Sequence, residues 1–104
     1  MIELIKTIFG IGPSVNYAEL VNDGAIILDV RTKGEFASGH IKGSMNIAVD
    51  QLAKNLHRLP DKEETVITVC ASGMRSATAM RILKSSGYTS VYNGGSWASL
   101  QSKI

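Results

Sequence analysis

The chain alternates short apolar runs with stretches of helical spacing. Two runs rich in β-branched residues, 25–30 and 65–69, lack the alternation of a strand with one solvated face. Such runs predict strands covered on both faces, as in a parallel sheet. Residues 90–92 predict a third strand, and residues 44–47 a further brief one. Because strands that alternate with helices favour βαβ units, the pattern predicts an α/β domain with a mainly parallel sheet.

Capping and stop residues predict the helices between these strands. Asn16 and Glu19 have N-cap and capping-box character and open a helix that stops near Gly24. A second helix starts at Ser76, and Gly87 has the position of its C′ residue. The other predicted helices run over 33–38, from Asp50 as N-cap to Pro60, and from Ser96 to Ile104 after a tight turn at Gly94-Gly95.

Length and composition narrow the class of protein. The 104 residues fit one domain spanning 1–104, with residues 1–15 as an N-terminal extension packed on it. Lys and Arg number 11, Asp and Glu number 9, and the basic residues are scattered, so no nucleic-acid partner is expected. The N-terminus lacks signal-peptide features, and no run approaches the roughly 18 apolar residues of a membrane span. We therefore expect a cytoplasmic monomer with no membrane partner.

The residues around the single cysteine, Cys70, predict a nucleophile. Cys70 ends a predicted buried strand just before a helix, where open α/β sheets bind their ligands. The helix N-terminus, a backbone nest around Gly73 and the charge of Arg75 all favour a thiolate over a thiol. A lowered pKa would make Cys70 nucleophilic. The alternative, a buried structural cysteine beside a glycine turn, leaves this coincidence of residues unexplained.

For other polar residues near the strand ends, the sequence gives weaker evidence of a role in the site. Asp29 and Arg31 are expected either to form a partly buried pair that braces the site or to occupy an ordinary strand-end turn. His40 is interpreted as a structural hydrogen-bonding residue, because a stabilised thiolate needs no base. With two distant histidines and no close carboxylate cluster, neither a metal nor a cofactor is expected. Since one small domain leaves no second domain to cover the site, we expect Cys70 near the surface.

The segment Cys70-Ala-Ser-Gly-Met-Arg-Ser76 resembles the active-site loop of rhodanese-like domains. Gly94-Gly95 is similar to the turn before the last helix of that family. The resemblance covers roughly Tyr17 to the C-terminus and implies a five-stranded, mainly parallel sheet with helices on both faces. The family's first signature block is matched in order and spacing by Leu28-Asp-Val-Arg31, Glu35-Phe36, Gly39-His-Ile41, Gly43 and Asn46-Ile47.

The resemblance also implies sulfurtransferase chemistry of the thiosulfate sulfurtransferase type. Cys70 would take a sulfane sulfur from thiosulfate or a persulfide and pass it, as a cysteine persulfide, to cyanide, a thiol or a protein acceptor. Arg75 would orient the loop or an anionic substrate, and Asp29 and Arg31 would support the site. The backbone N–H groups that bind substrate and persulfide would come from Ala71, Ser72, Gly73, Met74 and Ser76.

Two alternatives remain open. Cysteine-dependent phosphatases and arsenate reductases resemble this loop but place five residues between cysteine and arginine, whereas only four intervene here. The tighter loop suits a single sulfur atom better than a phosphate. Family members specialised for thiosulfate often carry a second basic residue in the loop, and Ala71, Ser72 and Met74 are uncharged. This departure leaves open a persulfide carrier or a regulatory binding module for a partner protein.

Overall fold

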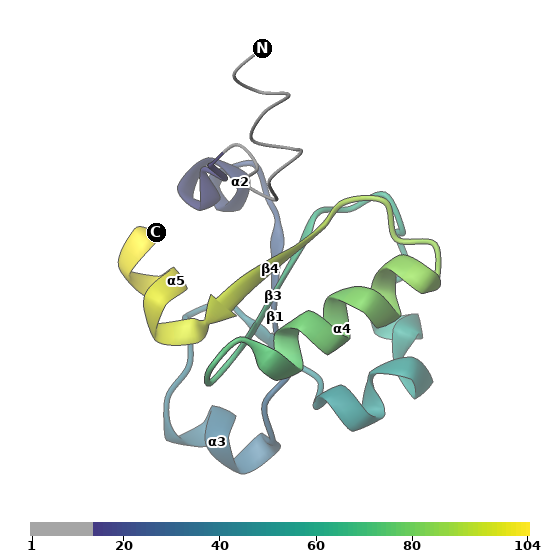
Figure 1. Cartoon of the computed structure of the whole chain (residues 1–104), viewed down its shortest axis with the longest axis horizontal. Helices are drawn as coiled ribbons and strands as arrows, with labels where there is room; N and C mark the ends of the chain where they lie inside the picture. Colours follow the sequence, from purple (N-terminus) through teal and green to yellow (C-terminus); the bar gives the residue numbers. More distant parts are fainter. Residues whose placement is uncertain (1–13) are drawn as a thin grey trace.

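A computed structural model describes residues 14–104 (Figure 1). Residues 1–13 of the predicted N-terminal extension (residues 1–15) lie outside the described residues. The chain then forms, in order, α2 (Tyr17–Asn22), β1 (Ile26–Asp29), α3 (Lys33–Ser38), β2 (Met45–Asn46), the 3₁₀ helices η1 (Val49–Lys54) and η2 (Leu56–Arg58), β3 (Val66–Cys70), α4 (Met74–Ser85), β4 (Val91–Ser96) and α5 (Trp97–Lys103).

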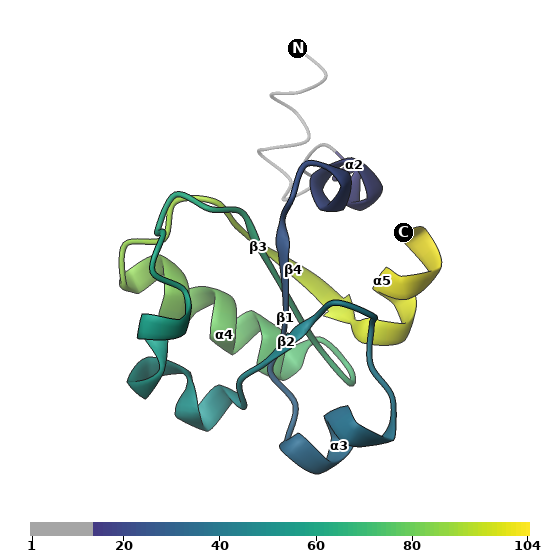
Figure 2. The same cartoon turned by 180° about the vertical axis from the view of Figure 1, so that it is seen from behind.

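Within residues 14–104 the sheet contains four parallel strands in the order β2-β1-β3-β4. The two apolar runs form its centre, β1 and β3, as predicted. The expectation of five strands is wrong for residues 14–104, because the segments between these strands lack further β-branched runs and form helices or turns. Figure 2 shows the short β2 beside β1 at one edge. The domain is therefore α/β, with an entirely parallel sheet of four strands.

Helices cover both faces of the sheet, as predicted. Figure 1 shows α4 with the two 3₁₀ helices on one side and α2 with α5 on the other. The first layer packs Leu52 and Leu83 against Leu28 and Val66, and the second packs Leu100 against the other face of the strands. No helix among residues 14–104 is long and apolar enough to cross a membrane.

Local capping explains where most helices begin and end. The Asn16 side chain accepts from the Glu19 N–H, which confirms the predicted N-cap of α2. The predicted helix over 33–38 is present as α3 and carries a complete capping box between Thr32 and Glu35. The helix α4 begins at Met74, two residues earlier than predicted, because Gly73 adopts a left-handed conformation that serves as its N-cap.

Two predicted elements differ in the structure. The helix expected from Asp50 to Pro60 is two short 3₁₀ helices, and Ala48 rather than Asp50 precedes the first. Asn55, with a φ of −123° and a ψ of 21°, interrupts the helical conformation between them, and both Leu52 and Leu59 reach the core. The predicted turn at Gly94-Gly95 is instead part of β4, beside a register shift at Thr68/Val69. A Cβ on Gly94 would lie 2.8 Å from Ile67 Cγ2, so glycine permits this close pairing.

Candidate active site

Cys70 is the last residue of β3 and lies at the carboxyl end of the sheet, as predicted. Its expected position near the surface is wrong, because Cys70 is 0% exposed. The loop that follows folds back over the sulfur, and its own residues Ala71, Ser72 and Met74 form the exposed surface there. Any reagent must therefore approach the sulfur through the loop.

The loop places hydrogen-bonding groups around the cysteine sulfur. The Gly73 N–H donates to Cys70 Sγ over 2.9 Å, and Ser76 Oγ lies 3.5 Å from the same atom. Gly73 has a φ of +102°, a conformation that disfavours side chains, so glycine is required for this turn. The resulting concave arrangement of N–H groups suits an anionic sulfur.

The pKa of the Cys70 thiol is lowered by the loop. Burial raises this pKa, but the Ser76 hydroxyl and the backbone N–H groups of Ser76, Gly73 and Ser72 lower it by more. Burial penalises the charged thiolate, whereas hydrogen bonds donated to the sulfur favour it. The second effect prevails here, so the site favours an ionised and nucleophilic cysteine.

Asn93, from β4, is a polar residue of the site that the sequence interpretation missed. The Ser76 hydroxyl, which is buried, donates to Asn93 Oδ1 over 2.6 Å and lies 3.0 Å from the Gly73 carbonyl. The Gly95 N–H also donates to Asn93 Oδ1, over 3.0 Å. Asn93 thus ties the start of α4 to the neighbouring strand. The only signal in the sequence was its position directly before Gly94-Gly95.

Arg75 points from α4 to a carboxylate on α3. Its Nη1 and Nη2 donate to Glu35 Oε1 and Oε2 over 2.7 and 3.0 Å, in a bidentate pair. Hydrogen bonding to Arg75 is the main cause that lowers the pKa of Glu35 from 4.5 to about 2. Figure 1 shows α3 beneath the loop that joins β3 to α4. Glu35 was noted only within a family motif, although the Thr32-x-x-Glu35 capping-box pattern could have placed it at a helix start.

Of the two arrangements expected for Asp29 and Arg31, the structure contains the pair, and it is buried more deeply than expected. Arg31 Nη2 donates to Asp29 Oδ2 over 2.8 Å and to the Gly39 carbonyl over 2.7 Å. Its guanidinium also lies 4.8 Å from the centre of the Trp97 ring. His40 makes the predicted hydrogen bond, with Nδ1 2.8 Å from the Phe36 carbonyl. These contacts hold together the segments around α3, which follows β1 at the same end of the sheet as the Cys70 loop.

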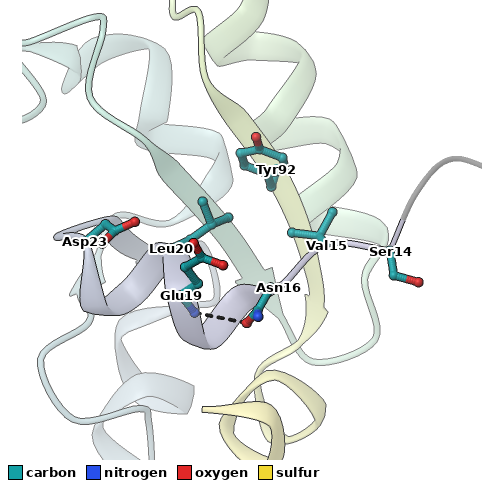
Figure 3. Close-up of a pocket in the computed structure, with 7 residues that line it drawn as sticks. All are labelled: Ser14, Val15, Asn16, Glu19, Leu20, Asp23 and Tyr92. Atoms are coloured by element: carbon teal, nitrogen blue, oxygen red, sulfur yellow. Dashed lines mark hydrogen bonds between the residues drawn. The ribbon is translucent and has the colours of Figure 1, made fainter.

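A separate cavity lies away from this loop. It has a volume of about 390 Å³ and is formed by the start of α2 and one residue of β4, none of which was a predicted site residue (Figure 3). Its lining comprises Ser14, Val15, Asn16, Glu19, Leu20, Asp23 and Tyr92. The cysteine chemistry and this cavity therefore belong to different regions of the molecule.

Comparison with known proteins agrees with the parallel α/β fold. The family model described as the rhodanese-like domain matches residues 15–102. The chain therefore belongs to the rhodanese-like domain family.

Individual relatives include small sulfurtransferases. Thiosulfate sulfurtransferase PspE of Escherichia coli is 35% identical over 69 residues, which cover 65% of this chain and 66% of PspE. Thiosulfate sulfurtransferase GlpE of Pseudomonas fluorescens is 31% identical over 81 residues, covering 78% and 73%. The solved structure of the human single-domain sulfurtransferase TSTD1 superposes with a TM-score of 0.73 at 29% identity, covering 84% and 90%. The chain thus spans about two thirds of the length of PspE.

Proposed function

We propose that this chain is a sulfurtransferase that carries a sulfane sulfur on Cys70 between a donor and a thiophilic acceptor. The observation that carries the proposal is the Gly73 N–H, which donates to Cys70 Sγ over 2.9 Å at the start of α4, with the Ser76 hydroxyl 3.5 Å from the same sulfur. Donors in this arrangement stabilise a thiolate and would equally stabilise a persulfide anion. The names of PspE, GlpE and TSTD1 support the same chemistry.

In the first step, the Cys70 thiolate attacks the outer sulfur of the donor. With thiosulfate, a new S–S bond forms to Cys70, the donor S–S bond breaks, and sulfite leaves with its electron pair. The cysteine sulfur is oxidised to the persulfide level and the departing sulfite is the reduced fragment. Thiolate and thiosulfate together carry the same charge as persulfide anion and sulfite, so no proton is needed.

In the second step, an acceptor nucleophile attacks the outer sulfur of the persulfide. Cyanide would form thiocyanate, and a thiolate would form a new persulfide. In both cases the electron pair of the Cys70 S–S bond returns to Cys70 as thiolate. The loop amides of Ser72, Gly73 and Ser76 face this leaving sulfur and lower the cost of its charge. We place the reaction in the cytoplasm, where thiols are reduced and available as acceptors.

Intact-protein mass spectrometry tests this proposal. Incubation with a panel of sulfane donors is expected to add the mass of one sulfur atom, and cyanide or dithiothreitol should remove it. Cys70→Ser and Cys70→Ala should lose the adduct while circular dichroism shows an unchanged fold. The absence of an adduct from every donor, or an adduct that survives in both variants, would refute the proposal.

A persulfide carrier that serves one partner protein is the second candidate. The uncharged, exposed residues Ala71, Ser72 and Met74 beside the buried sulfur favour it, because they offer no second cation to capture a small anion. Slow loading from thiosulfate combined with fast loading from a persulfidated protein would distinguish the carrier. Phosphatase or arsenate reductase chemistry has less support, since only four residues separate Cys70 from Arg75. Protection of Cys70 from alkylation by orthovanadate would revive it.

A further inference from the structure

Beside the Cys70 loop, the positive charge of Arg75 is paired with the negative charge of Glu35. Both terminal nitrogens of Arg75 bind Glu35, at 2.7 and 3.0 Å, and the two side chains are 36% and 38% exposed. A donor that approaches through solvent therefore meets one positive and one negative charge together. Their sum is zero, although Arg75 alone would attract an anion.

Glu35 is held in place by its own helix as well as by Arg75. Its Oε1 accepts from the Thr32 N–H and from the Thr32 hydroxyl, each over 3.1 Å. The Glu35 N–H in turn donates to Thr32 Oγ1 over 3.2 Å. The Thr32 bonds belong to the cap of α3 and do not depend on Arg75, so they hold the carboxylate and its negative charge beside the loop. Its pKa of about 2 keeps it ionised at neutral pH.

The rest of the loop surface adds no compensating charge. Ala71, Ser72 and Met74 are exposed, and the Met74 side chain presents an apolar thioether with the residue 78% exposed. Such a surface suits the carbon portion of an organic donor better than the oxygens of an inorganic anion. The loop amides remain the attractive groups, and they act on the transferred sulfur at short range.

We propose that Glu35 is a specificity-determining residue that selects the class of sulfur donor. By cancelling the charge of Arg75, it disfavours the dianion thiosulfate and favours an organic persulfide of low net charge. This inference rests on the proposed sulfur transfer through Cys70 and names the donor class for it. Glu35 acts through Arg75 and need not touch the reacting atoms.

Both donors give balanced reactions at Cys70. A protonated organic persulfide, R–S–SH, yields Cys70–S–SH and the thiolate R–S⁻ when the Cys70 thiolate attacks its outer sulfur. The donor S–S bond breaks, its electron pair leaves on R–S⁻, and the proton stays on the transferred sulfur. One negative charge is present before and after, whereas the thiosulfate reaction brings a dianion to a site that already holds a thiolate. The charges of Arg75 and Glu35 therefore affect the reaction with thiosulfate more than the reaction with the persulfide.

Glu35→Gln tests the inference, because glutamine can still accept from Arg75 but carries no charge. Single-turnover loading of Cys70 is measured by mass spectrometry with thiosulfate and with cysteine persulfide, at a pH where alkylation shows Cys70 fully ionised in each protein. At low ionic strength the thiosulfate rate should rise about fivefold, the order expected when one surface charge is unmasked toward a dianion. The persulfide rate should change less than about twofold, and added salt should reverse the thiosulfate gain.

Glu63→Gln is the matched control. Glu63 is an exposed residue in the turn before β3, at the opposite end of that strand from Cys70. It should leave the ratio of the two loading rates unchanged. The inference is overturned if Glu35→Gln lowers both rates together, if it leaves their ratio unchanged, or if Glu63→Gln reproduces the gain. Loading from neither donor in the unmodified protein would instead refute the proposed function, and the inference with it.

Discussion

Two arginine–carboxylate pairs lie near the carboxyl end of the sheet, and they differ in how deeply they are buried. The side chains of Arg31 and Asp29 are 6% and 0% exposed, whereas those of Arg75 and Glu35 are 36% and 38% exposed. Arg31 also donates to the carbonyls of Glu35 and Gly39, so it connects several backbone segments. The comparison indicates that the buried pair maintains the fold around the site, while the exposed pair sets the charge at the solvent-facing side of the Cys70 loop.

Loss of one charge from the buried pair should have the largest effect on stability. Asp29→Asn leaves the buried Arg31 charge without its counterion, so the free energy of unfolding should fall by about 3–5 kcal/mol. Urea denaturation followed by circular dichroism measures this loss. Glu35→Gln, the equivalent change in the exposed pair, should cost much less, because solvent screens that pair. Equal losses in the two variants would contradict the comparison.

Arg75→Ala should affect sulfur transfer more than stability. The variant leaves the Glu35 carboxylate uncompensated beside a thiolate, so single-turnover loading from thiosulfate should fall about tenfold. The free energy of unfolding should change by about 1 kcal/mol or less, because solvent screens this exposed pair. Adding Glu35→Gln to Arg75→Ala should restore part of the rate. An unchanged loading rate in Arg75→Ala would mean that the arginine has only a structural role.

The acid titration of Glu35 should show the smallest effect. Its pKa is lowered to about 2, so the stabilisation from its pair with Arg75 is complete above its ordinary value of 4.5 and is lost as pH falls toward 2. Carboxyl-carbon NMR should give a midpoint near 2 for Glu35 and a higher midpoint in Arg75→Ala, which stays below 4.5 because the Thr32 N–H still donates to the carboxylate. A Glu35 midpoint that does not move in Arg75→Ala would remove the evidence for a tight exposed pair.

The sequence predicts the parts of this molecule that depend on neighbours along the chain. The apolar runs at 25–30 and 65–69 become the central strands, and the Cys70–Gly73 spacing predicts a sulfur-binding turn that the structure contains. Asp29 and Arg31 are two residues apart, so their pairing follows from local geometry. Capping residues such as Asn16 identify helix starts for the same reason.

The features that the sequence interpretation missed depend on residues brought together from distant segments. Glu35 lies 40 positions from Arg75, and Asn93 lies 17 positions from Ser76, so neither contact has a local signal. The burial of Cys70 was missed because domain size alone does not show how the loop folds over its own sulfur. The inclusion of Gly94 in β4 depends on its close approach to Ile67, which only the packed sheet reveals.

The central claim is that the loop stabilises an anionic sulfur at Cys70 through its own hydrogen-bond donors. The most direct test is the rate of Cys70 alkylation by iodoacetamide as a function of pH, with Ser76→Ala as the matched variant. The midpoint should lie below the roughly 8.5 of an unperturbed cysteine, and Ser76→Ala should shift it upward by removing the hydroxyl near Sγ. A midpoint at or above about 8.5 in the unmodified protein would contradict the claim.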